Sequence, residues 1–153
     1  MPKQEALITE SHNLYHSIGF VLGRMDTMVA FVPAKAKDDF SDKFHEATGR
    51  DPYPNEQGLT IHPEGTNKYW TECRIIFRAR PEELFTLFLG LGHKQIVKGA
   101  GNERWNINSN PLCFKLLSLG FVLGTTQNAA QIRARIPAPF LVDFNNGVAE
   151  AQG

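Results

Sequence analysis

Cysteine is scarce in this 153-residue chain, which has only Cys73 and Cys113. Each lies within an apolar pattern and no C-x-x-C spacing occurs, so two buried thiols are favoured over a disulfide or a metal pair. His12 and His16 lie one helical turn apart, a spacing that can hold zinc. Because no H-E-x-x-H pattern and no third ligand accompany them, we expect a solvated helix start instead.

Long apolar runs are also missing. The opening residues, MPKQEALITESHN, have no apolar core like that of a signal peptide. No stretch reaches the length of a membrane span. We therefore expect an intracellular protein that does not contact a membrane, and a length that fits one domain with a real core.

Net charge is the third thing that the sequence lacks. Sixteen basic and sixteen acidic side chains cancel, so the chain as a whole is not drawn to nucleic acid or to an anionic membrane. Residues 1–70 hold seven Lys/Arg against ten Asp/Glu, 71–135 hold nine against four, and 136–153 hold none against two. The basic middle segment is therefore where an anionic ligand is expected.

Apolar periodicity, with proline at helix starts and glycine at helix stops, predicts a chain of the α/β (α+β) class. Helices are expected over Leu14–Arg24, 36–48, 81–92, 110–119 and 138–153. Strands are expected over Thr27–Pro33 and Thr71–Arg80, and a hairpin over 93–109 around the turn GAGN. The stretch 50–69 is expected to form a loop, and AAQIRARIP (129–137) an extended segment.

Small residues stand four apart in the first and last predicted helices, at Gly19 and Gly23 and at Gly147 and Ala151. Positions i and i+4 share one helix face, so such pairs let two helix backbones approach closely. The alternative is that these residues only relieve local crowding against the core. The spacing alone does not decide between the two.

Two stretches, LYHSIGFVLGRMDTMVAFVP and IPAPFLVDFNNGVAEAQG, resemble the signature segments of the LAGLIDADG homing endonucleases. Between them, RIIFRARPEELFTLFLGLG and WNINSNPLCFKLLSLG lie where that family places strand, helix, hairpin and helix. The resemblance covers roughly residues 11–153, with an inserted helix and loop near 34–69. It implies an αββαββα domain over 1–138 whose saddle-shaped antiparallel sheet lies in the DNA major groove. A second signature helix over 139–153 would pack on the first.

In that family an acidic residue at the end of each signature helix helps to hold a divalent cation, since Mg²⁺ prefers oxygen ligands and activates water. The resemblance puts Arg24 and Gln152 at these two positions, and neither brings a negative charge. Asp26 and Glu150 are each two residues away, which is the far side of a helix. We therefore expect no catalytic residue, metal or cofactor, and Mg²⁺ only if these displaced acids act.

A polar, mostly cationic set of side chains runs along the predicted strands and the extended segment. Its members are Arg74, Arg78, Arg80, Lys94, Lys98, Arg104, Asn106, Asn108, Arg133 and Arg135. Arginine suits both phosphate and guanine contacts, so we expect these residues to bind nucleic acid. The alternative is a solvated sheet face, since antiparallel sheets often leave one side wet.

Three functions remain open from the sequence. The leading one is a protein that binds duplex DNA or structured RNA and resembles a homing endonuclease without its cleavage site. The second is an active Mg²⁺-dependent DNA endonuclease that uses the displaced acids, and the third is an assembly domain that does not meet nucleic acid. The resemblance also implies either a homodimer or a missing second domain as partner.

Overall fold

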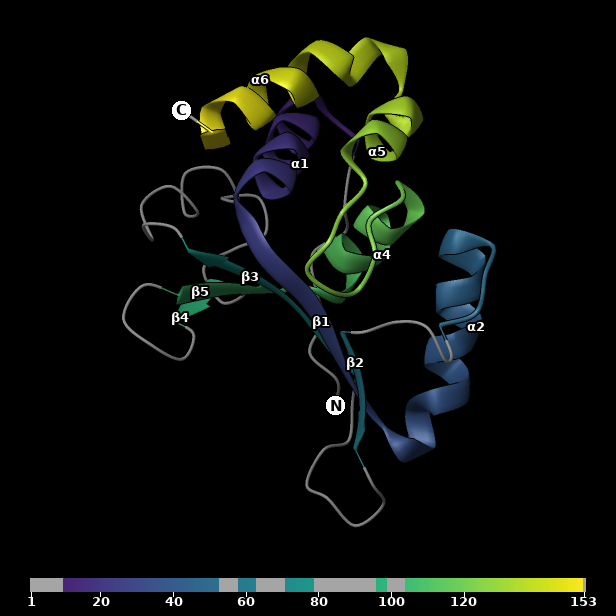
Figure 1. Ribbon diagram of the computed structural model, residues 1–153. Helices are drawn as coiled ribbons and strands as arrows, with labels where there is room; N and C mark the ends of the chain where they lie inside the picture. Colours follow the sequence, from purple (N-terminus) through teal and green to yellow (C-terminus); the bar gives the residue numbers. More distant parts are fainter. Residues whose placement is uncertain (1–9, 53–57, 63–70, 79–95, 99–103, 153) are drawn as a thin grey trace.

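The computed structural model describes residues 10–52, 58–62, 71–78, 96–98 and 104–152. The predicted mixture of helices and strands is confirmed, and helices α1, α4, α5 and α6 gather on one side of the sheet (Figure 1). The elements are α1 His12–Arg24, β1 Met25–Pro33, η1 Ala34–Ala36, α2 Lys37–Thr48, β2 Leu59–His62, β3 Glu72–Arg78, β4 Ile96–Lys98, β5 Arg104–Asn108, α4 Asn110–Ser118, α5 Ala129–Arg135, η4 Ala138–Phe140 and α6 Leu141–Gln152.

The five strands lie in the order β2-β1-β3-β5-β4. All neighbours are antiparallel except β1 and β2, which are parallel, so the sheet is mixed rather than antiparallel throughout. Strand β2 also corrects the prediction of a loop over 50–69. It is held by long-range contacts: Ala30 N–H donates to the Gly58 carbonyl at 2.9 Å, and Gly58 N–H donates to the Leu123 carbonyl at 3.2 Å.

The core forms where the helices meet one face of the sheet. Strand β3 buries the predicted alternating row of Cys73, Ile75 and Phe77, and β1 buries Met28 and Ala30 against it. Both cysteines are free thiols inside this core, as the sequence predicts. The opposite row of β3 therefore turns away from the helices.

Local capping signals explain the helix ends that the sequence predicts well. The Ser11 hydroxyl accepts the Leu14 N–H at 3.0 Å and begins α1. Gly49 ends α2 in the left-handed conformation, with φ of 75°. Ser109 caps α4 by accepting the Leu112 N–H at 3.3 Å. The helix predicted over 81–92 lies outside the described residues. Among the residues that the structure describes, no helix is long and apolar enough to cross a membrane.

The prediction of an extended segment over 129–137 is wrong, because its first part forms helix α5. The Asn128 side chain accepts the Gln131 N–H at 3.0 Å and begins the helix, and Ile132 is its buried residue. Positions two apart on a helix lie on nearly opposite sides, so Arg133 and Arg135 do not share a face. The Nε of Arg133 donates to Oδ1 of Asn145 on α6 at 3.1 Å, which ties it to the helices.

Candidate functional site

Helices α1 and α6 approach so closely that only glycine fits at their crossing. A Cβ on Gly19 would lie 2.0 Å from the Phe144 carbonyl oxygen, and one on Gly147 would lie 1.9 Å from the His16 carbonyl oxygen. Gly23 and Ala151 meet one turn further along, where a Cβ on Gly23 would lie 2.7 Å from that of Ala151. All four small residues predicted for helix packing thus lie where α1 and α6 touch. We call this contact between the two helices the seam.

The two helices run in the same direction, since the start of α1 contacts the start of α6 and their ends also meet. Parallel helices place like ends of their dipoles side by side, which is unfavourable. Asp143 lies in the first turn of α6, at the positive ends. Arg24 lies at the negative ends, where its Nε donates to the Ala151 carbonyl at 2.8 Å. These two charges offset the repulsion.

Histidine–carboxylate pairs cross the same seam. Nδ1 of His12 lies 2.6 Å from Oδ2 of Asp143, and Nε2 of His16 lies 2.5 Å from Oε2 of Glu150. His12 is 71% exposed, so the start of α1 is solvated as expected, and both rings also contact carboxylates of α6. Within the described ranges, no group of three or more His, Cys, Asp or Glu side chains could hold a metal ion.

The residues near the helix ends are arranged differently from the prediction. Arg24 also lies over the Phe20 ring, with its guanidinium carbon 5.1 Å from the ring centroid. Asp26 is not on a helix, because α1 ends at Arg24 and Asp26 belongs to β1, where the register with β3 shifts between Met25 and Thr27. Such a bulge re-aims the strand locally. Glu150 faces His16, and Gln152 is exposed at the end of α6.

The outer face of the sheet is the row that faces away from the core. Backbone register pairs Arg74 with Asn108 and Arg78 with Arg104, so these four predicted positions share it. Position 98 on β4 pairs with Trp105, which packs against the core. Position 98 therefore belongs to the core-side row and not to the row of Arg74, as the prediction had it. Two further predicted residues, Arg80 and Lys94, lie outside the described residues.

Asn106 is on the outer face but is only 8% exposed, so the prediction of a surface contact is wrong there. Its register neighbours are position 76 on β3 and position 97 on β4, so it lies between two paired strands. A side chain enclosed by two neighbouring strands is less accessible than one near a strand end. The accessible part of this face is therefore around Arg74 and Asn108.

Arg74 is held by a network that the sequence prediction missed. Its Nε and Nη2 donate to the two carboxylate oxygens of Glu72, each at 3.0 Å, and Asn108 Nδ2 donates to Glu72 Oε1 at 3.2 Å. The guanidinium carbon lies 4.9 Å from the Phe31 ring centroid, and that ring stacks on His62 at 5.8 Å. The signal was present: Glu72 stands two residues before Arg74, on the same strand face.

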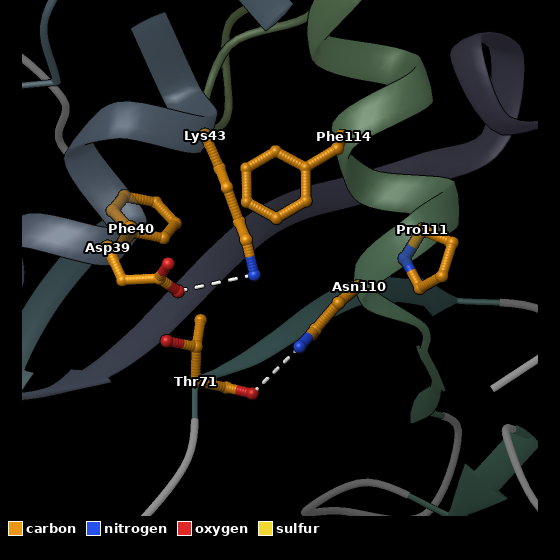
Figure 2. Close-up of a pocket in the computed structure, with 7 residues that line it drawn as sticks. All are labelled: Asp39, Phe40, Lys43, Thr71, Asn110, Pro111 and Phe114. Atoms are coloured by element: carbon orange, nitrogen blue, oxygen red, sulfur yellow. Dashed lines mark hydrogen bonds and ion pairs between the residues drawn. The ribbon is translucent and has the colours of Figure 1, made fainter. Parts of the chain in front are cut away.

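A pocket of about 370 Å³ lies on the helix side of the molecule, between α2, α4 and the residue before β3 (Figure 2). Its polar groups bind each other: Lys43 pairs with Asp39 at 3.2 Å, and Asn110 Nδ2 donates to the Thr71 carbonyl at 2.9 Å. Apolar walls complete it, from the rings of Phe40 and Phe114 and the side chain of Pro111. Since the Lys43, Asp39 and Asn110 side chains are engaged by these bonds, we assign no chemistry to it.

A titratable cluster joins the start of the described chain to α4. Lys115 Nζ binds the Glu10 carboxylate and lies 5.6 Å from the centroid of the Tyr15 ring. Burial alone would raise the pKa of Glu10, but the bond from Lys115 outweighs it and lowers that pKa. Burial raises the pKa of Tyr15, and Glu10 adds to the effect. The Lys115 pKa is raised because its bond to the Glu10 carboxylate outweighs burial.

The described residues thus define an α+β domain with a glycine seam on one side of its sheet and an arginine network on the other. No family model, curated protein or solved structure matches the chain. The function has to be argued from these two features.

Proposed function

We propose that the chain binds duplex DNA or structured RNA through the outer face of its sheet, without cutting it. The observation that carries this proposal is the fixed guanidinium of Arg74, which Glu72 and Phe31 hold on that face beside Asn108. A preorganised arginine on a sheet face suits nucleic acid, because its planar fork matches both phosphate and base edges. The register partners Arg78 and Arg104 extend the same row.

The resemblance to LAGLIDADG homing endonucleases supports the same function. The order of α1, β1, β3, β4, β5 and α6 agrees with what the resemblance implies. So does the packing of the first and last helices through small residues. Strand β2 lies within the segment proposed as an insertion and adds a parallel edge strand to the sheet.

Absence of cleavage is proposed from the ends of the helix seam. Arg24 binds the end of α6 there, and Gln152 is an amide. A guanidinium repels a divalent cation, and an amide cannot supply the negative charge that Mg²⁺ favours. The helix ends therefore stabilise each other instead of holding a metal.

A gel-shift series across salt concentrations tests binding. The triple variant Arg74→Gln, Arg78→Gln, Arg80→Gln should weaken binding to duplex DNA and structured RNA. Its log–log salt slope should fall by about 0.9 for each arginine that contacts a phosphate. The matched control removes three cations from the α2 region, Lys35→Gln, Lys37→Gln, Lys43→Gln, and should bind like the parent.

Equal affinity and slope for the parent and the folded arginine variant would contradict the proposal. The assembly function would then be favoured, because the helix seam is complete without a ligand. Circular dichroism of both triple variants shows whether folding is intact.

A further inference from the structure

We infer that Glu72 makes Arg74 a reader of guanine edges instead of a general phosphate contact. The inference rests on the proposed function and specifies what one part of the outer face recognises. It starts from the geometry of the pair. Arg74 meets Glu72 with the edge formed by Nε and Nη2, and both hydrogen bonds are 3.0 Å long. This two-point pairing fixes the plane of the guanidinium.

The other edge of the guanidinium is still able to bind. Arginine has five N–H donors, and Glu72 uses two of them. In the part of the chain that the structure describes, Nη1 makes no hydrogen bond. Nη1 and the second hydrogen of Nη2 together form a fork, and such a fork matches the O6 and N7 acceptors of guanine in the major groove.

Charge decides which acceptor this fork prefers. The Glu72 carboxylate cancels the charge of Arg74 locally, and both side chains are partly buried, at 24% and 31% exposed. A phosphate approaching Arg74 also approaches this carboxylate and is repelled by it. A guanine edge is neutral and is not repelled in this way. The pair therefore favours a base over the backbone.

Two neighbours keep the pair in place. Phe31 lies against the guanidinium at 4.9 Å, and Asn108 donates to Glu72 Oε1 at 3.2 Å. Asn108 Oδ1 is buried and makes no hydrogen bond with the described residues, so Asn108 acts through Glu72 in this arrangement. Glu72 and Asn108 are thus positioning residues, and Arg74 is the contact residue.

The substitution Glu72→Gln tests the inference. It keeps the shape of the side chain but removes the charge and one of the two acceptors facing Arg74. The released guanidinium should then bind phosphate. On a short G·C-rich duplex, the salt slope should rise by about 0.9, and affinity should increase roughly tenfold at about 0.1 M salt.

A second measurement asks what Arg74 reads in the parent protein. The same duplex with every guanine replaced by 7-deazaguanine lacks N7 but keeps its charge. The parent should lose roughly 2- to 10-fold in affinity for it, the contribution of one hydrogen bond. Arg74→Gln should abolish this loss, and Glu72→Gln should reduce it.

The matched control is Glu46→Gln, which removes one negative charge on the exposed surface of α2. It should change neither the slope nor the guanine preference. If the parent binds but Glu72→Gln behaves like Glu46→Gln, or 7-deazaguanine has no effect, the inference is overturned while the proposed function stands. If the parent binds no duplex and no structured RNA, the proposed function itself fails, and the inference fails with it.

Discussion

Individual carboxylates of this chain serve different purposes, and their partners determine which. Glu72 is bound by Arg74 and Asn108 on the outer face, where we propose that its charge affects a ligand. Glu10 is bound by Lys115 on the helix side, next to the buried Tyr15 ring. An ion pair away from the proposed binding face is expected to affect stability and not recognition. Its contribution can therefore be measured by unfolding alone.

At acid pH, Glu10→Gln should remove part of the pH dependence of unfolding. The folded-state pKa of Glu10 lies below its ordinary value of 4.5. The unfolded chain therefore binds more protons, and the pair stabilises the fold above that value. This contribution is lost as pH falls through the lowered pKa. Urea unfolding between about pH 7 and pH 3 should give a shallower acid decline for Glu10→Gln than for the parent.

The control for this prediction is again Glu46→Gln, whose side chain lies on α2. It should follow the parent across the same pH range. If both variants lose stability in parallel with the parent as pH falls, Glu10 contributes nothing through Lys115.

Among the elements, those with local signals could be predicted from the sequence. Ser11 and Gly49 mark the ends of α1 and α2, and the alternation from Cys73 to Phe77 marks β3. Strand β2 could not be predicted, because it exists through pairing with β1 and through contacts of Gly58. The alternation in α5 was misleading, although the Asn128 cap was a readable signal for a helix.

The candidate site was only partly predictable, for a physical reason. A search for cations finds Arg74, and strand alternation places it outward. Glu72 shares the strand face of Arg74, but whether it pairs with the guanidinium depends on side-chain geometry that alternation does not give. Similarly, the spacing of Gly19 and Gly147 suggests close packing. Which backbone atoms they meet depends on how α1 and α6 cross, and that follows from the complete fold.

The seam predicts that a glycine-to-alanine substitution in a helix lowers the free energy of unfolding instead of raising it. In an exposed helix, replacing glycine by alanine normally stabilises by about 0.5–1 kcal/mol. Gly147→Ala should instead lower the free energy of unfolding by about 1–3 kcal/mol or more, because its Cβ would lie 1.9 Å from the His16 carbonyl oxygen. Thermal unfolding should show a Tm lower by roughly 3–10 °C.

Asn146→Ala is the matched control, since position 146 is the exposed neighbour of Gly147 on α6. It should leave Tm within about 2 °C of the parent. A stabilised Gly147→Ala would mean that the two helices do not cross at this distance.

For the whole molecule, the seam affects how the chain can assemble. The glycine face of α1 is covered by α6 of the same chain. A second copy can pack on that face only by displacing α6, together with the His12–Asp143 and His16–Glu150 contacts. A homodimer of the kind implied by the resemblance would therefore require exchange of α6 between copies, or contact through another surface.

The same seam leads to the prediction that bound nucleic acid is not cut. Supercoiled plasmid should stay intact with Mg²⁺ or Mn²⁺ at protein concentrations that saturate binding. Arg24 places a positive charge at the joined helix ends, where it binds the Ala151 carbonyl, and Glu150 is held by His16. Asp26 lies at the strand bulge instead of on the helix. A divalent cation would meet a guanidinium there before it met a pair of carboxylates.

Metal-dependent nicking that Asp26→Ala or Glu150→Ala abolishes would contradict this prediction and favour an endonuclease that uses displaced acids. Asp143→Asn is the control, because Asp143 lies at the opposite end of the seam and pairs with His12. If all three variants reduced nicking alike, damage to the seam would explain the loss. Selective loss with Asp26→Ala and Glu150→Ala would instead identify these two carboxylates as metal ligands, and Arg24 would have to move away from Ala151 when the metal binds.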